Sequence, residues 1–286
     1  MPRTDFDYLF SARDTVYSYE LFLNAVAQFP AFCNEHRPSA DSFDNLGTDE
    51  SACRRELATL FAHIIYESGQ PVSGDETSFL TGLQILMEPG CQPAPVVNPA
   101  ECKYEDTGTT TSVNYPAFDS VDYFRRGPIG LRWNNFYTEF SKSYFDAAAY
   151  QSFRLLLADP DRMMNEPALL FASALWRYMV PRSPKASAHA LISGMFEPNQ
   201  FDKNLGVGNN FGSTIDAMAL DSSDGQTSEC NNGRETEGAQ LRGEIYGFLL
   251  RFFKLNAERD LGCATTIMTN GGAGTSPSHW FYKDEN

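Results

Sequence analysis

An apolar run in the sequence, FAHIIYESGQ (61–70), leads directly into the carboxyl group of Glu67. Apolar neighbours and the negative end of a helix dipole both disfavour a charged carboxylate, so both raise the pKa of a carboxyl group. A general acid that works near neutral pH requires such a raised pKa. Ser68 and Gly69 are small enough to leave the group accessible. We therefore interpret Glu67 as a candidate general acid, the alternative being a solvated carboxylate at a frayed helix end.

A general acid that cleaves a glycosidic bond needs a second carboxylate. In an inverting enzyme the two carboxyl groups stand roughly 6.5–9.5 Å apart, which leaves room for the attacking water. The stretch after Glu67 offers six candidates: Asp75, Glu76, Glu88, Glu101, Glu105 and Asp106. Composition does not choose among them.

Helical periodicity predicts the elements that position these groups. Apolar residues at helical spacing, among them Leu60 and Ile64, predict a helix over 49–68 that carries Glu67 in its last turn. Further helices are expected over about 14–28, 143–158, 166–180, 185–195 and 236–254. Two polar, irregular stretches, 70–120 and 196–235, are long enough to be functional loops. The expected class is mainly α, with two long loops that flank a groove.

Charge and composition exclude several partners. The 286 residues carry a net charge of -15, so a nucleic acid or an anionic membrane surface would be repelled. No run of 18 apolar residues exists, which argues against a membrane span. The first residues lack an apolar signal core, so we expect either a cytosolic protein or a mature form whose signal is absent from this chain.

The six cysteines allow two interpretations, three disulfides or six reduced thiols, and spacing alone does not decide. No CxxC pair is present, and with only four histidines a zinc site is not expected.

Four segments in order resemble glycoside hydrolase family 19, the chitinases with a lysozyme-like α-helical fold. The most specific is YFRRGPIGLRWNNFY (123–137), which is similar to the family's Tyr-Tyr-Gly-Arg-Gly-Pro-Ile-Gln-Leu segment and the Trp-Asn-Phe-Asn-Tyr that follows it. The others are LFAHIIYESG (60–69), FASALWRYMVPRSPKASAHALISGMF (171–196), and SEC (228–230) followed by QLRGEIYGFLLRF (240–252). The resemblance implies one bilobal catalytic domain over 1–286, of which the first 45 residues carry little of the signal.

The resemblance also implies catalytic roles. Glu67 falls on the family's general acid, with Tyr66 in the place of its usual His partner. Glu88 in GLQILME (82–88) has the spacing of the general base in bacterial members, if an insertion at 70–81 is assumed. Plant members place the base near a cysteine, which would favour Glu101 or Glu105. We rank Glu88 first.

A charge network and a set of cleft residues complete the implied site. Glu229 and Arg242 stand thirteen residues apart, close to the interval of a family pair that forms a network with the acid. An arginine near two carboxylates keeps one ionised and positions the other. The residues implied in substrate binding are Tyr66, Tyr123, Arg126, Arg132, Trp133, Asn134, Asn135 and Lys185. For Tyr123 and Trp133 the alternative is ordinary core packing, and for Arg242 an exposed position on an amphipathic helix.

The resemblance also implies which cysteines form disulfides with each other. Cys230–Cys263 would match the family's last disulfide and Cys91–Cys102 its short loop disulfide, which leaves Cys33–Cys53. Three disulfides favour an oxidising compartment and hence a secreted protein.

Several positions depart from the family pattern. Gly130 stands for a Gln and Arg132 for a Ser or Lys, where the Ser of plant members helps to hold the attacking water. Ala219 stands for an Asn, with extra residues at 221–227, and the substrate-binding Asn of the Phe-Asn-Tyr segment is shifted to Asn135 or lost. Water positioning and sugar contacts are therefore altered while the acid is kept.

Three hypotheses follow. The first is an endo-acting, inverting hydrolase of β-1,4-linked N-acetylglucosamine polymers such as chitin, a monomer that needs neither a metal nor an organic cofactor. The second is a hydrolase of peptidoglycan, and the third is a glycan-binding protein with little or no catalysis. A second carboxylate facing Glu67 across a cleft would favour the first two.

Overall fold

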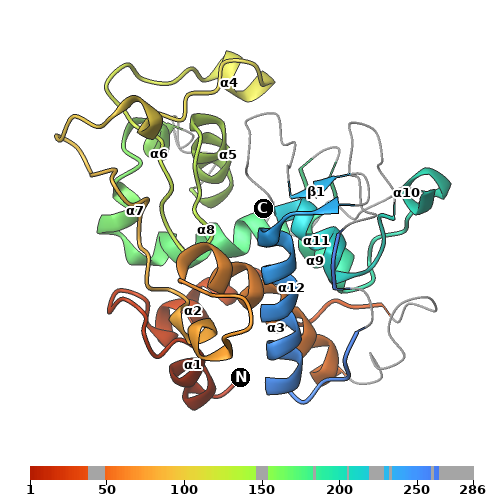
Figure 1. Cartoon of the computed structure of the whole chain (residues 1–286). Helices are drawn as coiled ribbons and strands as arrows, with labels where there is room; N and C mark the ends of the chain where they lie inside the picture. The colour runs from red at the N-terminus through yellow and green to blue at the C-terminus, as the bar shows by residue number, and fades with distance from the viewer. Residues whose placement is uncertain are drawn as a thin grey trace.

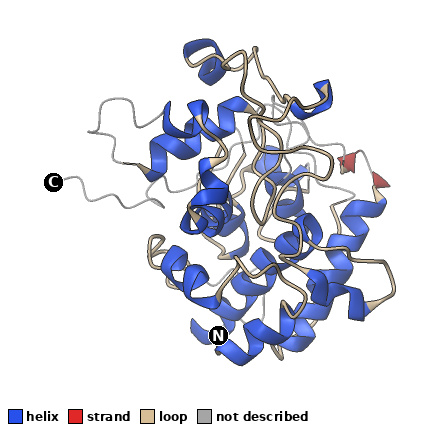
Figure 2. Cartoon of the chain, turned by 90° about the vertical axis from the view of Figure 1, so that its left-hand side faces the viewer, coloured by secondary structure: helices blue, strands red, loops and turns tan. Residues whose placement is uncertain are grey.

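The computed structural model describes residues 1–37, 49–145, 154–182, 185–204, 206–218, 229–231, 234–258 and 261–263. Helices dominate these residues, and two short strands form a small antiparallel pair (Figures 1 and 2). The α-helices are α1 (Arg3–Leu9), α2 (Tyr19–Val26), α3 (Asp49–Ser68), α4 (Thr110–Asn114), α5 (Asn134–Tyr144), α6 (Leu155–Ala158), α7 (Arg162–Asn165), α8 (Pro167–Met179), α9 (Ala188–Ile192), α10 (Gln200–Asn204), α11 (Phe211–Met218) and α12 (Glu237–Phe252). The short elements are the 3-10 turns η1 (Glu76–Thr81) and η2 (Ala100–Cys102) and the strands β1 (Cys230–Asn231) and β2 (Arg234–Glu235).

Helices α3 and α12 lie side by side at the centre of the molecule (Figure 1). They run antiparallel, because Arg54 near the start of α3 donates to the carbonyl of Phe253 after α12, at 3.0 Å. At the opposite end, Arg242 near the start of α12 reaches Glu67 near the end of α3. The pairing therefore brings the two segments that carry the expected acid and its arginine to one place.

An aromatic cluster holds the N-terminal helices together. Phe6 of α1, Phe22 of α2 and Phe61 of α3 are buried with Phe171 of α8. Neighbouring rings pack with centroids 5.5–5.7 Å apart. Burying each such ring contributes roughly 1.5–3 kcal/mol. This core fixes α3 in the fold and so fixes the position of its last turn.

The end of α3 is tied to the loop that follows it. Asp49 and Glu50 lie in the first turn, where negative charge suits the helix dipole. At the last turn the Ser68 hydroxyl donates to the Ile64 carbonyl at 2.7 Å and accepts from the Leu83 N–H at 3.0 Å. The Ser68 carbonyl accepts from the N–H groups of residues 84 and 85. The stretch that leads to Glu88 is thus held against the helix that carries Glu67.

The helices form two lobes. One lobe contains α4–α7, and the other contains α1–α3 with η1 and α12 (Figure 1). Loops, drawn in tan in Figure 2, connect them. Three disulfides, Cys33–Cys53, Cys91–Cys102 and Cys230–Cys263, pair all six cysteines as the resemblance implied. No described helix has the length and apolar character needed to cross a membrane.

Several predicted helix boundaries were wrong. The helix expected over 143–158 is two elements among the described residues, since α5 ends at Tyr144 and α6 begins at Leu155, while 146–153 lie outside the description. Helix α5 begins with two Asn residues, which disfavour a helix interior, and α11 contains Gly, Ser and Thr. Both helices are largely buried, so tertiary packing rather than propensity stabilises them.

Candidate active site

Glu67 lies in the last turn of α3 with its side chain 19% exposed. The Arg242 guanidinium donates to its Oε1, and Arg125 Nη2 donates to its Oε2 at 2.5 Å. Burial raises the pKa of the Glu67 carboxyl, as expected, but the charges of Arg242 and Arg125 outweigh burial and hold that pKa below its ordinary value. The prediction that the surroundings favour the protonated form is therefore wrong for the free protein, because the arginines come from distant segments.

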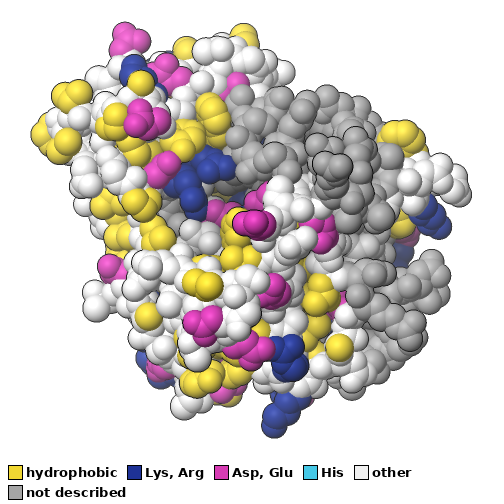
Figure 3. Space-filling view, in the orientation of Figure 1, with side chains coloured by type: hydrophobic (Ala, Val, Ile, Leu, Met, Phe, Trp, Pro, Cys, Tyr) yellow, Lys and Arg dark blue, Asp and Glu magenta, His cyan; other side chains and the backbone are white. Residues whose placement is uncertain are grey.

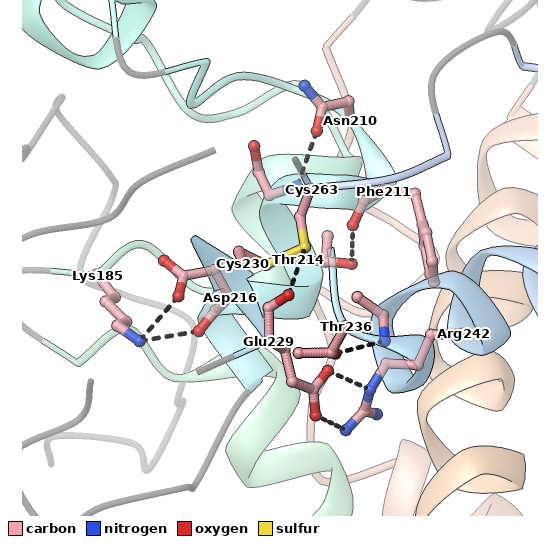
Figure 4. Close-up of a disulfide and its surroundings, with 12 residues drawn as sticks. Lys185, Asn210, Phe211, Thr214, Asp216, Glu229, Cys230, Thr236, Arg242 and Cys263 are labelled. Carbon is pink, nitrogen blue, oxygen red and sulfur yellow. Dashed lines mark hydrogen bonds and ion pairs between the residues drawn. A yellow bond between two sulfur atoms is a disulfide. The ribbon is translucent and has the colours of Figure 1, made fainter. Parts of the chain in front are cut away.

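Arg242 is the centre of the charge network. It is 2% exposed, and it donates to both Glu229 carboxylate oxygens, from Nε at 3.0 Å and from Nη2 at 3.2 Å (Figure 4). Its guanidinium lies over the ring of Tyr66, with the carbon 3.8 Å from the ring centroid. Burial alone would lower the pKa of Arg242, but Glu67 and Glu229 raise it above the ordinary value. Arg242 is therefore a fixed positive charge between two carboxylates.

His63 supports this arginine as a neutral group. Burial, followed by the charge of Arg242, holds the pKa of His63 well below its ordinary value. The Thr214 hydroxyl donates to the Phe211 carbonyl at 2.7 Å, so His63 Nε2 donates to that hydroxyl at 3.0 Å. This leaves Nδ1 as an acceptor for Arg242 Nη1 at 3.3 Å. The hydrogen bonds thus select one tautomer and orient Arg242 toward Glu67.

Glu88 lies in the loop that follows α3 and η1, and both Glu88 and Glu67 form hydrogen bonds with Arg125. Its Oε2 accepts from the Arg125 backbone N–H at 3.0 Å, and its own N–H donates to the Arg125 carbonyl at 2.9 Å. Its Oε1 accepts from the Tyr104 hydroxyl at 2.6 Å. Burial, followed by Glu88, raises the pKa of Tyr104 to about 12, so Tyr104 remains a donor near neutral pH. Glu67 and Glu88 thus bind the side chain and the backbone of the same residue.

The other five candidate carboxylates have different surroundings. Glu101 is exposed, and Glu105 stands 3.8 Å from Lys103. Three others have local structural partners: Asp75 caps η1, Glu76 pairs with Arg251, and Asp106 accepts from Gly108 and Thr109. Among the six, and within the described residues, Glu88 alone forms a hydrogen bond with a residue, Arg125, that also binds Glu67.

Three of the expected substrate-binding residues lie partly exposed near these carboxylates. Tyr66 packs beneath Arg242, and the charge of Arg132 helps to lower the pKa of Glu67. Trp133 packs edge-on against Tyr104, with ring centroids 5.2 Å apart. Trp133 also has a φ of 70°, which costs a residue of this type of order 1–3 kcal/mol. The fold maintains this strained conformation at the start of α5.

The remaining expected substrate-binding residues are buried. Tyr123 donates to the Leu157 carbonyl at 2.8 Å, which agrees with the alternative of core packing for this residue. Arg126 forms an ion pair with Asp161. Asn134 accepts from the Asp106 N–H at 2.6 Å and so holds the 103–108 loop. Asn135 accepts from the N–H of Phe136 at 2.9 Å.

Lys185 is also buried, at 8% exposure, on the other side of the strand pair from Arg242 (Figure 4). Its Nζ donates to the Asp216 carbonyl at 2.9 Å and lies 3.4 Å from an Asp216 carboxylate oxygen. Burial lowers the pKa of Lys185, and the Asp216 carboxylate opposes that effect. The structure does not bring Lys185 into hydrogen-bonding contact with Glu67 or Glu88 within the described residues. Ala219 and residues 221–227 lie outside the description.

Sequence reasoning missed two residues of the site, Arg125 and Tyr104. Arg125 stands in the Arg-Gly-Pro-Ile segment at a position where the family pattern quoted above has Gly, and this difference was the available signal. Tyr104 follows Cys102 in an irregular loop without any periodic pattern. Figure 3 shows that basic side chains gather in a hollow between the two lobes, beside acidic ones, on an otherwise acidic molecule.

A sequence profile of the family described as class I chitinase, glycoside hydrolase family 19, matches residues 7–263. The chain belongs to this family. The family match confirms the resemblance, and the low identities below fit a divergent member.

Plant endochitinases match this family 19 chain in sequence over part of their length. The endochitinase WIN8 of Populus trichocarpa is 30% identical over 198 residues, which are 68% of this chain and 52% of the relative. The endochitinase CH25 of Brassica napus is 27% identical over 193 residues, which are 66% of this chain and 49% of the relative. The chain thus spans about half the length of the curated relatives it matches.

Solved structures share the fold. Chitinase C from Streptomyces griseus HUT6037 superposes with a TM-score of 0.61 at 23% identity, over 92% of this chain and 96% of that one. A class IV chitinase from Zea mays gives a TM-score of 0.50 at 20% identity, over 86% of each chain. The expected fold class, mainly α and lysozyme-like, is confirmed.

Proposed function

We propose that this chain is an endo-acting, inverting hydrolase of β-1,4-linked N-acetylglucosamine polymers, namely chitin and chito-oligosaccharides. The observation that carries the proposal is the shared residue Arg125, which binds Glu67 through its guanidinium and Glu88 through its backbone. Inverting hydrolysis requires two carboxyl groups on opposite sides of the scissile bond, and the contacts of Arg125 support Glu67 and Glu88 as this pair. Membership in the class I chitinase family supports the same reaction.

In this mechanism Glu67 donates a proton to the leaving glycosidic oxygen. Glu88 accepts a proton from a water that attacks the anomeric carbon from the opposite face, so the product has inverted configuration. The Tyr104 hydroxyl orients the Glu88 carboxylate through its hydrogen bond to Oε1. The reaction needs no metal or organic cofactor, because both proton transfers are made by carboxyl groups.

Aromatic and cationic groups around the pair suit a sugar polymer. Trp133 and Tyr104 form a packed aromatic pair, and Arg132 lies with its guanidinium carbon 5.9 Å from the Tyr104 ring centroid. Flat aromatic faces pack against the apolar faces of sugar rings, while polar tips bind hydroxyl or acetamido groups. We assign these three residues, with Tyr66, to the walls of the substrate cleft.

The stereochemical course tests the proposal directly. Proton NMR during the first minutes of chitohexaose cleavage is expected to show α-anomers as the initial products. Initial β-anomers would contradict an inverting pair, and the absence of any cleavage would contradict the hydrolase.

The identity of the base is tested by three matched variants. We expect Glu88→Gln to lower the rate roughly 10²–10⁴-fold, as removal of a general base does. Glu101→Gln and Glu105→Gln are expected to retain it, because neither carboxylate binds Arg125. Retention of the rate by Glu88→Gln would exclude Glu88 as the base.

Peptidoglycan is a second candidate substrate, and the arginines near Glu67 favour it. Arg125 and Arg132 both act on the Glu67 carboxyl, and cations at this place would also attract the lactyl carboxylate of a muramyl residue. Comparing turnover of chitohexaose with turnover of purified bacterial cell walls decides between the two. Binding of N-acetylglucosamine oligomers without cleavage of either would instead indicate a glycan-binding protein.

We further propose that residues 1–286 form one catalytic domain that acts as a secreted monomer. Three disulfides support an oxidising compartment, since such bonds are rare in reducing ones. The strongly negative charge disfavours nucleic acids and anionic membranes as partners.

A further inference from the structure

Within the described residues, the hydrogen bonds of Arg125 all go to the two proposed catalytic residues. Its Nη2 donates to the Glu67 carbonyl at 2.9 Å and to Glu67 Oε2 at 2.5 Å. Its backbone N–H and carbonyl are both bonded to Glu88. The hydrogen bonds of its guanidinium, within the described residues, all go to Glu67. A change in the position of this guanidinium would therefore act on Glu67 first.

The space for this guanidinium exists because residue 130 is a glycine. A Cβ atom at Gly130 would stand 2.8 Å from Arg125 Nη2 and 3.0 Å from its guanidinium carbon, which is too close. The backbone pair between residues 126 and 131 holds the turn in which this approach occurs. The family pattern has Gly and Gln where this chain has Arg125 and Gly130, so the large and the small residue have exchanged places. The arginine thus occupies room that the turn provides for a side chain.

Arg125 and Arg242 differ in how firmly they are held. Arg242 is 2% exposed and has Glu229, His63 and Tyr66 as further partners. The side chain of Arg125 is 27% exposed, and its one ion pair among the described residues is with Glu67. Arg125 is therefore the member of the pair that can move away without leaving another buried carboxylate unpaired.

Proton donation by Glu67 requires an oxygen that carries a proton and faces the glycosidic oxygen. Arg242 binds Oε1 in a buried network, and Arg125 binds Oε2. A proton on Oε2 and the N–H of Arg125 would compete for that oxygen, because a cationic donor favours the ionised carboxylate. The arrangement seen in the free protein is thus a resting one for a general acid.

We propose that Arg125 is a positioning residue that holds Glu67 as a carboxylate in the free protein and is displaced by bound oligosaccharide, which frees Oε2 to carry the proton. This inference rests on the proposed function of Glu67 as the acid. The charged groups that act on Glu67 come from three packed segments: Arg242 from α12, Arg125 and Arg132 from the 125–132 turn, and Arg177 from α8. The titratable groups that contact Arg125 or Arg242 are Glu88, Glu229, His63 and Tyr66.

Carbon NMR of protein labelled at the glutamate carboxyl groups tests the first half of the proposal. The Glu67 signal is assigned by its loss in Glu67→Gln. We expect this carboxyl to titrate at higher pH in Arg125→Met than in the wild type. Arg251→Met removes an exposed ion pair with Glu76 and is the control, expected to leave the Glu67 titration unchanged. An unchanged Glu67 titration in folded Arg125→Met would overturn the proposal.

The second half is tested without changing Arg125. Glu88→Gln, in which turnover is expected to be roughly 10²–10⁴-fold slower, is titrated with and without saturating chitohexaose. Displacement predicts that bound chitohexaose shifts the Glu67 titration to higher pH. A bound complex in which Glu67 titrates as in the free protein contradicts displacement, and this measurement decides the matter even if Arg125→Met does not fold.

The pH profile of activity supplies a kinetic readout that a purely structural role would not move. The profile of kcat/KM reports groups of the free enzyme, and an acid that must be protonated makes the rate fall as pH rises through its pKa. The alkaline limb is therefore expected at higher pH in Arg125→Met than in the wild type. A wild type that neither binds nor cleaves chitohexaose refutes the proposed function, while the labelled-carboxyl titration still reports on Arg125.

Discussion

A single buried arginine, Arg242, links the two carboxylates of the network to α12. Replacing it with alanine leaves Glu67 and Glu229 without this partner, and breaking a buried charge pair from one side costs about 3–5 kcal/mol. We expect Arg242→Ala to lower the free energy of unfolding by about this amount in urea titrations. Arg251→Ala, which removes an exposed pair, is the control and is expected to change it by less than about 1 kcal/mol. Equal losses in the two variants would show that the network contributes no more than a surface pair.

The lowered pKa of Glu67 makes a part of the stability pH-dependent. Arg242 and Arg125 together outweigh the effect of burial, so the folded-state pKa lies below the unfolded one. The corresponding stability is fully present above the unfolded pKa and is lost as the pH falls through the folded pKa. We expect the wild type to lose free energy of unfolding on acidification more steeply than Glu67→Gln. Urea titrations at a series of acidic pH values measure this, and identical slopes would contradict it.

At the scale of elements, the Cys91–Cys102 disulfide joins the loop that follows Glu88 to the loop that carries Tyr104. Removing it by a double Cys→Ser change is expected to lower stability by about 3 kcal/mol, as for a short closed loop. It should also lower kcat/KM by roughly tenfold or more, because small displacements of catalytic groups are costly.

The matched control is the double Cys→Ser change at Cys33 and Cys53, which join the segment after α2 to α3. A similar loss of stability with an unchanged kcat/KM is expected there. If both variants lose kcat/KM equally, the Cys91–Cys102 bond has no special role in positioning Tyr104.

The helices that periodicity defines were predictable from the sequence, and the site was predictable in part. The apolar stripe and acidic first turn placed α3 at residues 49–68, and α8 and α12 agree within a residue or two at each end. Helices α5 and α11 were missed, because they contain Asn, Gly, Ser and Thr, which have low helix propensity, and packing in the tertiary structure stabilises them.

The contacts of Arg125 could not be predicted for a different reason. They depend on how a turn at residues 126–131 approaches the end of α3, and neither segment encodes that approach locally. The same convergence of distant segments made the expected direction of the Glu67 pKa wrong. Periodicity therefore located the acid, whereas its protonation state is a property of the tertiary structure.

At the scale of the whole molecule, the net charge of -15 is expected to change the association rate of charged substrates but not of neutral ones. We expect kcat/KM for neutral chitohexaose to change little between low and high salt, because a neutral ligand is not steered. For partially deacetylated, cationic chitosan oligomers we expect kcat/KM to fall as salt screens the attraction. Initial rates at several salt concentrations measure both, and a strong salt dependence with the neutral substrate would contradict this expectation.

The bilobal architecture places Glu67 where a helix end, a loop and a turn from distant parts of the chain meet. The measurement that tests its role most directly is kcat/KM for chitohexaose of Glu67→Gln against the wild type, with Glu101→Gln as the control. Loss of a general acid predicts a fall of roughly 10²–10⁴-fold in Glu67→Gln and none in the control. A Glu67→Gln variant that cleaves chitohexaose at the wild-type rate would contradict the assignment of Glu67 as the acid.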